Sequence, residues 1–235
     1  MDPDRFLCAL FVPAAVRTEA FALVCLHHEL ERAVFGTPGR SAHGPVAAMI
    51  RLGWWREVLA GEREDWRGND LAVRVRAVTA RGAPVAAVLG GMVEAYEDAA
   101  AGIEDAEGWR TLLERGPGGL QEAVAILVGD TDPVALARAR TAGAAHALGR
   151  RAGRTGGDGE ELDAAGECRR LLTLARGALP ARDRRAPLLP AVLAARDLAR
   201  GDGGTAETGR GVMDRLAVAW TALRPGGGLR GVASS

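Results

Sequence analysis

A histidine and a glutamate stand four residues apart inside a long apolar segment of the sequence. His27 and Glu31 share one face of the helix expected there, because side chains four apart project in the same direction. An imidazole and a carboxylate placed in this way can bind a metal ion or form a proton-transfer pair. A hydrogen-bonded polar pair gives the same pattern, and a metal site needs more than two ligands. The neighbouring His28 is a further candidate residue.

Two adjacent tryptophans flanked by arginines occupy residues 50–57, Ile-Arg-Leu-Gly-Trp-Trp-Arg-Glu. Arg51 and Trp55 are four apart, so the guanidinium can lie along the indole face. Arg51 and Arg56 can also clamp a phosphate through parallel hydrogen bonds. The alternative is plain packing with exposed arginines. Because adjacent side chains cannot both face inward on one narrow helical stripe, we expect one tryptophan in the core and the other at its margin.

Acidic residues gather near the end of the helix expected over residues 84–101. Glu94 and Asp98 are four apart, with Glu97 between them. They could coordinate Mg²⁺ together with a diphosphate, because Mg²⁺ prefers oxygen ligands. A solvated face at a helix end carries the same pattern, and this is the alternative interpretation.

Residues 153–159 form a glycine-rich basic stretch, Gly-Arg-Thr-Gly-Gly-Asp-Gly. Such a turn before a helix can cradle a phosphate with its backbone N–H groups. It lacks the closing Gly-Lys-Ser/Thr of a P-loop, and it follows an expected helix where a P-loop follows a strand. A linker is the simpler interpretation of this stretch.

The composition excludes several classes of protein. The 235 residues carry 30 acidic and 30 basic side chains, all of the basic ones arginine, and the net charge is zero. This balance argues against a general electrostatic footprint for nucleic acid or for an anionic membrane, and no expected helix is both basic and amphipathic enough to predict membrane binding. Three scattered cysteines without a C-x-x-C pair argue against a disulfide framework or a cysteine zinc site.

The start of the chain does not predict export. It begins with acidic residues, and its apolar run covers only residues 6–16, which is wrong for a secretory signal. No run approaches the roughly 20 apolar residues of a membrane span. The sequence therefore predicts a cytoplasmic protein without a transmembrane segment.

Alanine and leucine abound while strand-forming residues are scarce, so the sequence predicts an all-α fold. Residues 1–224 should form a single-domain helical bundle, and residues 225–235 should form a flexible tail. The apolar stripe of the second helix includes Leu23, His27 and Leu30, which places that helix near the middle of the bundle. The expected helices cover residues 3–12, 13–35, 45–60, 70–81, 84–101, 107–115, 120–128, 132–152, 160–179, 186–200 and 210–223.

Several stretches together resemble the squalene/phytoene synthase family, in a branch similar to a mitochondrial complex I assembly factor and its bacterial relatives. The Ile-Arg-Leu-x-Trp-Trp-Arg-Glu run is similar to a signature of that branch. The other matching stretches are residues 2–7, 10–13, 22–23, 28–30, 178–180 and 186–194, together with Arg17.

The resemblance implies an isoprenoid-synthase-type fold with a central cavity. Active members of the family condense two prenyl diphosphates head to head, with Mg²⁺ held by two Asp-rich motifs. Here the first motif would fall on Glu31, Arg32 and Phe35. The first Asp of the second motif would fall on Arg154, and four residues later Asp158 is acidic. Glu31 and Asp158 are thus the implied metal positions, each alone in a degraded motif.

We therefore expect a non-catalytic binding or assembly scaffold that assists respiratory complex assembly, peripheral to the inner membrane, with a prenyl diphosphate, a lipid or a respiratory-complex subunit as its partner. The first alternative is a Mg²⁺-dependent prenyltransferase, in which Arg51 and Arg56 clamp phosphate. Its candidate metal ligands are His27, Glu31, Glu94, Asp98 and Asp158. A second alternative is a helical protein with a small-ligand pocket and no link to isoprenoids, in which the tryptophans only pack.

Overall fold

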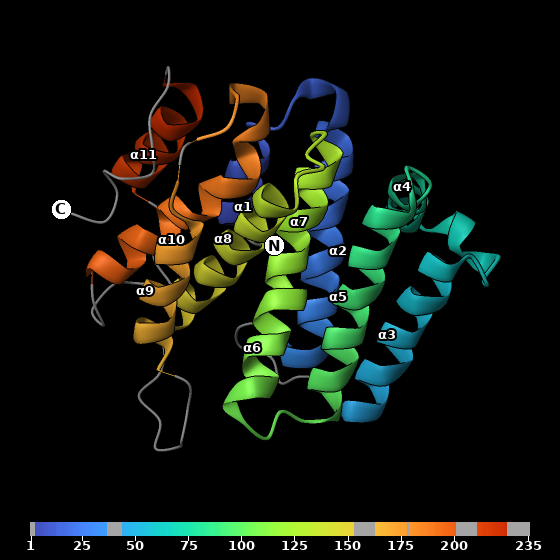
Figure 1. Ribbon diagram of the computed structural model, residues 1–235. Coiled ribbons are helices and arrows are strands. Elements are labelled where there is room, and N and C mark those ends of the chain that lie inside the picture. Colours follow the sequence, from blue (N-terminus) through green and yellow to red (C-terminus); the bar gives the residue numbers. More distant parts are fainter. Residues whose placement is uncertain (1–2, 37–43, 153–162, 178, 201–210, 225–235) are drawn as a thin grey trace.

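The computed structural model describes residues 3–36, 44–152, 163–177, 179–200 and 211–224, and this part of the chain contains helices and no strand (Figure 1). The all-α prediction is therefore confirmed. The glycine-rich stretch 153–159, Asp158 within it and the expected tail 225–235 lie outside the described residues. The α-helices are α1 (Pro3–Ala9), α2 (Arg17–Phe35), α3 (Pro45–Ala60), α4 (Asp70–Thr79), α5 (Ala83–Ala101), α6 (Ala106–Arg115), α7 (Pro117–Leu127), α8 (Pro133–Ala152), α9 (Ala164–Ala175), α10 (Leu189–Arg200) and α11 (Val212–Leu223).

Prolines and glycines set most of the helix ends. Pro45 opens α3 at its first position, and Gly61 ends it with a positive φ of 82°. Several helix starts differ from the sequence prediction by two to four residues, and two of them have a local cause. A short 3-10 turn follows Pro13, so α2 begins only at Arg17. The helix expected from residue 120 begins at Pro117, because a proline fits the first turn, where its missing N–H costs nothing.

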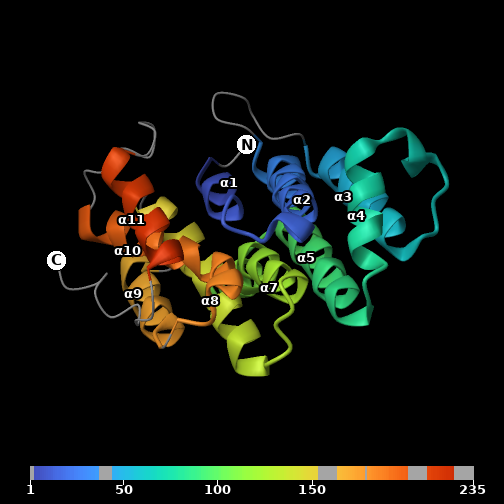
Figure 2. The ribbon, with the colours of Figure 1, turned by 90° about the horizontal axis from the view of Figure 1, so that it is seen from above.

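Helix α2 lies in the middle of the bundle and contacts α1, α3, α4, α5 and α7 (Figure 2). Its inward stripe includes Leu23, His27 and Leu30, each at most 1 % exposed. The central position predicted from the apolar periodicity is therefore confirmed. Each buried leucine of this stripe contributes about 1.5–3 kcal/mol to folding.

Helix α1 closes the bundle next to α2 and α10. It brings two charged residues, Asp4 and Arg5, into the interior. The Asp4 carboxylate lies 3.4 Å from Nε2 of His146 on α8, which is also buried. A buried carboxylate needs such partners because its desolvation is costly. The first helix is thus fixed by polar contacts as well as by apolar packing.

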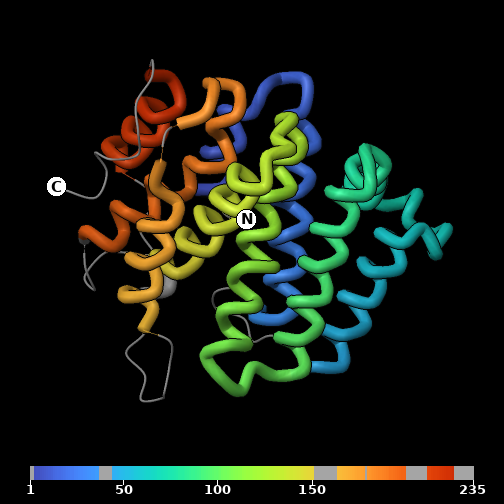
Figure 3. Tube along the Cα trace, in the orientation of Figure 1, coloured from blue at the N-terminus to red at the C-terminus, as the bar shows by residue number. Residues whose placement is uncertain are grey.

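The chain passes from the α2–α5 side of the bundle to the α9–α11 side through α7 and α8, as the trace in Figure 3 shows. These two helices meet at glycines. A Cβ added to Gly143 of α8 would stand 2.2 Å from the carbonyl oxygen of Pro117 and 3.0 Å from Cα of Gly118. Beside this contact Arg140 donates two hydrogen bonds, of 2.8 and 2.7 Å, to the carboxylate of Glu122. The backbones can approach this closely only because side chains are absent.

Replacing Gly143 by alanine should lower the free energy of unfolding by about 3 kcal/mol or more, because the new methyl group would overlap a backbone oxygen that cannot move away. Chemical denaturation followed by circular dichroism measures this change. Gly90→Ala in α5 is the matched control, since nothing lies within 4 Å of its added Cβ. That control should be neutral or stabilising by up to about 1 kcal/mol. Equal effects of the two substitutions would refute the close contact.

Candidate functional site

His27 is enclosed in the bundle centre, where its Nε2 and the hydroxyl of Tyr96 on α5 are joined by a hydrogen bond of 2.9 Å. The two rings meet edge to face, with centroids 5.6 Å apart. Burial, and after it the charge of Arg5 and the nearby imidazoles of His28 and His146, lower the pKa of His27 well below its ordinary range. Burial also raises the pKa of Tyr96 well above its ordinary range. The two side chains therefore form a neutral buried pair near pH 7.

The positions aligned with the first Asp-rich motif lie at the C-terminal end of α2. The side chain of Glu31 is exposed. Arg32 donates a hydrogen bond of 3.1 Å to Glu29. Phe35 stacks on Trp109 of α6, with centroids 6.2 Å apart and rings inclined by 19°, and meets Tyr96 edge to face. One surface carboxylate, one paired arginine and one aromatic ring occupy this segment.

The tryptophan run lies on α3, and its arginines join this helix to both neighbours. Arg51 donates to Glu29 of α2 at 3.0 Å. Arg56 donates to both carboxylate oxygens of Glu97 on α5, at 3.0 and 3.2 Å. These ion pairs are partly exposed and each contributes at most about 1 kcal/mol. Both guanidinium groups that the sequence suggested for a phosphate are therefore engaged with protein carboxylates.

The two tryptophans divide as expected. Trp55 is 3 % exposed and belongs to the core, whereas Trp54 is half-buried at its margin. On α5 the candidate Glu94 is exposed and forms an ion pair with Arg115 of α6, and Asp98 is exposed. In the part of the chain that the structure describes, no three His, Cys, Asp or Glu side chains come together as a metal site. Asp158 falls outside that part, so its position relative to Glu31 is not described.

A pocket of about 550 Å³ opens between α2, α3 and α4. Two candidate residues, His28 and Trp55, line it together with Glu29, the partner of Arg51. Burial lowers the pKa of His28, so its imidazole is mostly neutral near pH 7. The remaining lining residues are Thr18, Phe21, Ala22, Cys25, Asn69, Leu71 and Arg74. The Oδ1 atom of Asn69 caps α4 by accepting from two backbone N–H groups.

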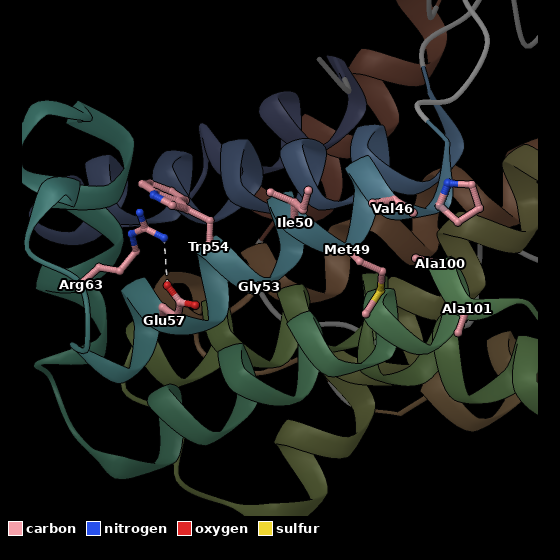
Figure 4. A pocket seen from close by; sticks show the side chains of 10 residues that line it. Val46, Met49, Ile50, Gly53, Trp54, Glu57, Arg63, Ala100 and Ala101 are labelled. Atoms are coloured by element: carbon pink, nitrogen blue, oxygen red, sulfur yellow. Dashed lines mark hydrogen bonds and ion pairs between the residues drawn. The ribbon is translucent and has the colours of Figure 1, made fainter.

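A second, more open groove of about 650 Å³ runs along the outer side of α3 toward the end of α5 (Figure 4). Its walls are apolar, and Val46 and Ile50 are 74 % and 70 % exposed. One end carries an ion pair in which Arg63 donates to Glu57 at 2.9 Å. The other lining residues are Pro45, Met49, Gly53, Trp54, Ala100 and Ala101. Val46 and Met49 were not among the residues predicted from the sequence, because their spacing is also that of a core stripe.

The structure thus separates the sequence candidates instead of gathering them at one point. His27 lies in the core, His28 and Trp55 line the smaller pocket, and Arg51 and Arg56 lie on the two sides of α3. Glu31, Glu94 and Asp98 are at the surface. Among the described residues no helix has the length and apolar character needed to cross a membrane. Comparisons with protein-family models, curated proteins and solved structures find no match.

The burial of His27 predicts a pH dependence of stability. Below pH 6.5 the unfolded chain protonates this histidine while the folded chain does not, so the unfolded state binds more protons. The free energy of unfolding should therefore fall as the pH drops from 6.5 to 5, by up to about 1.4 kcal/mol per pH unit from this group. Denaturation at several pH values measures the slope.

Two variants show which histidine causes this pH dependence. His27→Gln should flatten it, since the titrating group is gone. His28→Gln should keep most of it, because His28 is only partly buried and its pKa is lowered less. An unchanged slope in His27→Gln would show that another group causes the acid sensitivity.

Proposed function

We propose that this chain is a non-catalytic binding or assembly scaffold with an isoprenoid-synthase-type fold, related to the squalene/phytoene synthase family. The main observation behind the proposal is the set of side chains found at the C-terminal end of α2. Where the family resemblance aligns Mg²⁺ ligands, Arg32 pairs with Glu29 and Phe35 packs between Tyr96 and Trp109. The all-helical bundle around α2 supports the proposed fold type, and a central cavity belongs to the same proposal.

Diphosphate chemistry would need more oxygen ligands than this segment offers. Mg²⁺ is bound through carboxylates, water and phosphate oxygens, and it offsets the charge of the leaving diphosphate. A phenyl ring cannot be a ligand, and an arginine repels a cation. The described residues of the first aligned motif therefore do not fit a Mg²⁺ site.

The arginines of the tryptophan run support the same conclusion. A phosphate clamp needs guanidinium groups that are open to a ligand. Arg51 and Arg56 instead bridge α3 to Glu29 and Glu97 on the flanking helices. In the proposed scaffold the run acts structurally: Trp55 anchors α3 in the core, and the arginines fix how the helix is rotated.

In this orientation one apolar edge of α3 faces outward. Val46, Ile50 and Trp54 then line the open groove beside α5. We propose that this groove binds the apolar part of a partner, a prenyl chain, a lipid or an apolar segment of a respiratory-complex subunit. Burying apolar surface of this kind stabilises a complex by about 25 cal/mol per Å² of surface removed from water.

The catalytic alternative is tested directly by incubating the purified protein with farnesyl or geranylgeranyl diphosphate and Mg²⁺. We expect diphosphate release no faster than in the protein-free blank, because the aligned ligand positions are occupied by Arg32 and Phe35. Mass spectrometry of the organic phase gives the products, and far-ultraviolet circular dichroism verifies folding. Turnover that disappears in Glu31→Ala or Asp158→Ala would establish a prenyltransferase and end the scaffold proposal.

The groove is tested by the binding of farnesol, followed through tryptophan fluorescence. Ile50→Glu places a charge in the middle of the apolar wall and should weaken binding at least about tenfold, which corresponds to about 1.4 kcal/mol. Val134→Glu on α8 is the matched control, since Val134 is also a largely exposed branched residue. Equal affinities in the two variants would exclude the groove as the binding site. If the wild-type protein does not bind farnesol, a prenyl chain is excluded as the ligand of the groove.

A further inference from the structure

Helix α11 has an unusual distribution of side chains, because its largest apolar residues face away from the protein. Trp220 is 67 % exposed and Val212 is 72 % exposed. The buried positions of the same helix hold Asp214, Val218, Thr221 and Ala222. We call the exposed set the α11 outer stripe; it consists of Val212, Met213, Leu216, Trp220 and Leu223.

The outer stripe is continuous along the helix. At about 100° per residue its members all project within about 100° of one another. The buried residues Asp214 and Val218 project from the opposite side. An amphipathic helix normally turns its apolar stripe toward the core, so this orientation is reversed.

Two polar contacts hold α11 in the reversed orientation. Arg196 of α10 donates to the buried carboxylate of Asp214 at 2.5 Å. Arg185, itself buried, donates to the backbone oxygen of Arg224 at 2.5 Å, where the last carbonyl groups of α11 lack helical partners. Rolling the helix to bury its stripe would break the ion pair and leave a buried charge without its partner, which is strongly unfavourable.

The charges around the outer stripe indicate what kind of surface it can bind. Arg215 is exposed beside it, while Asp214, which is the only acidic residue of α11, faces inward and is neutralised by Arg196. The outward face of this helix therefore presents apolar groups and positive charge without negative charge. That combination matches an anionic lipid surface, whose headgroups attract arginine and whose acyl boundary accepts apolar side chains. Tryptophan is the residue best suited to this interface.

A second copy of the chain is a poorer occupant. The stripe consists of five side chains on one helix of 12 residues, whereas a stable protein interface uses about 20–30 residues on each side. Stable protein interfaces bury about 800 Å² on each partner. Helix α11 also lies at the edge of the bundle, against α10, so it can reach a flat surface (Figures 1 and 2).

From these observations we propose that α11 docks the protein on an anionic lipid surface. The helix lies in the plane of the interface, with its outer stripe in the acyl boundary and Arg215 at the headgroups. The proposal goes beyond the scaffold function and does not depend on it, because it uses neither the α3–α5 groove nor any partner.

Co-sedimentation with lipid vesicles tests the proposal on the full chain. One set of vesicles contains phosphatidylcholine, and the other an equimolar mixture with phosphatidylglycerol. We expect the protein to bind the mixed vesicles more tightly. Leu216→Glu should weaken that binding at least about tenfold, because a charge enters the acyl boundary. Leu174→Glu on α9 is the matched control, because Leu174 and Leu216 are 56 % and 55 % exposed, and it should bind like the wild-type protein.

Two further variants separate the apolar and charged contributions. Arg215→Ala should weaken binding to the mixed vesicles about fivefold, and its effect should vanish at high salt. Trp220→Phe should retain binding but lose the blue shift of fluorescence that accompanies insertion. Absence of vesicle binding, or equal loss in Leu216→Glu and Leu174→Glu, would overturn the proposal. If the protein self-associates and Leu216→Glu abolishes this self-association, the stripe binds a second copy of the chain. That result would also overturn the lipid-docking proposal.

Discussion

The close approach of α7 and α8 is the constraint on which the C-terminal half of the structure depends. Gly118 and Gly143 let the two backbones touch, and the Glu122–Arg140 pair fixes their alignment. Helices α9 and α10 pack directly on α8, and α11 in turn packs on α10. The position of each later helix therefore depends on a contact at which two residues must lack a side chain, Gly118 and Gly143. A larger residue at this point would displace several elements at once.

Much of the fold follows from local sequence. Alanine-rich segments between prolines and glycines predict the helices closely, and the stripe through Leu23 and His27 correctly places α2 at the centre. The division between Trp54 and Trp55 also follows, because adjacent side chains on a helix diverge. These features depend on residues near one another in the chain, where periodicity and capping contain the needed information.

The partners of the polar residues could not be predicted in this way. Tyr96, which meets His27, is 69 positions away in the chain, and Glu97, which meets Arg56, is 41 positions away. Nothing in helical periodicity links such pairs. The same applies to α11: the spacing of Leu216 and Trp220 is that of an ordinary core stripe. The long-range contacts of Asp214 with Arg196 and of Arg224 with Arg185 hold the stripe outward.

The two exposed apolar surfaces lie at opposite edges of the bundle. Figures 1 and 2 place α3, whose residues line the groove, at one edge and α11 at the other. A protein resting on lipid through α11 would hold the groove away from the bilayer, facing the aqueous phase. A partner captured there would be confined to a thin layer above the membrane. Its search for a membrane-bound target would become two-dimensional, and its effective concentration near that target would rise without any new contact.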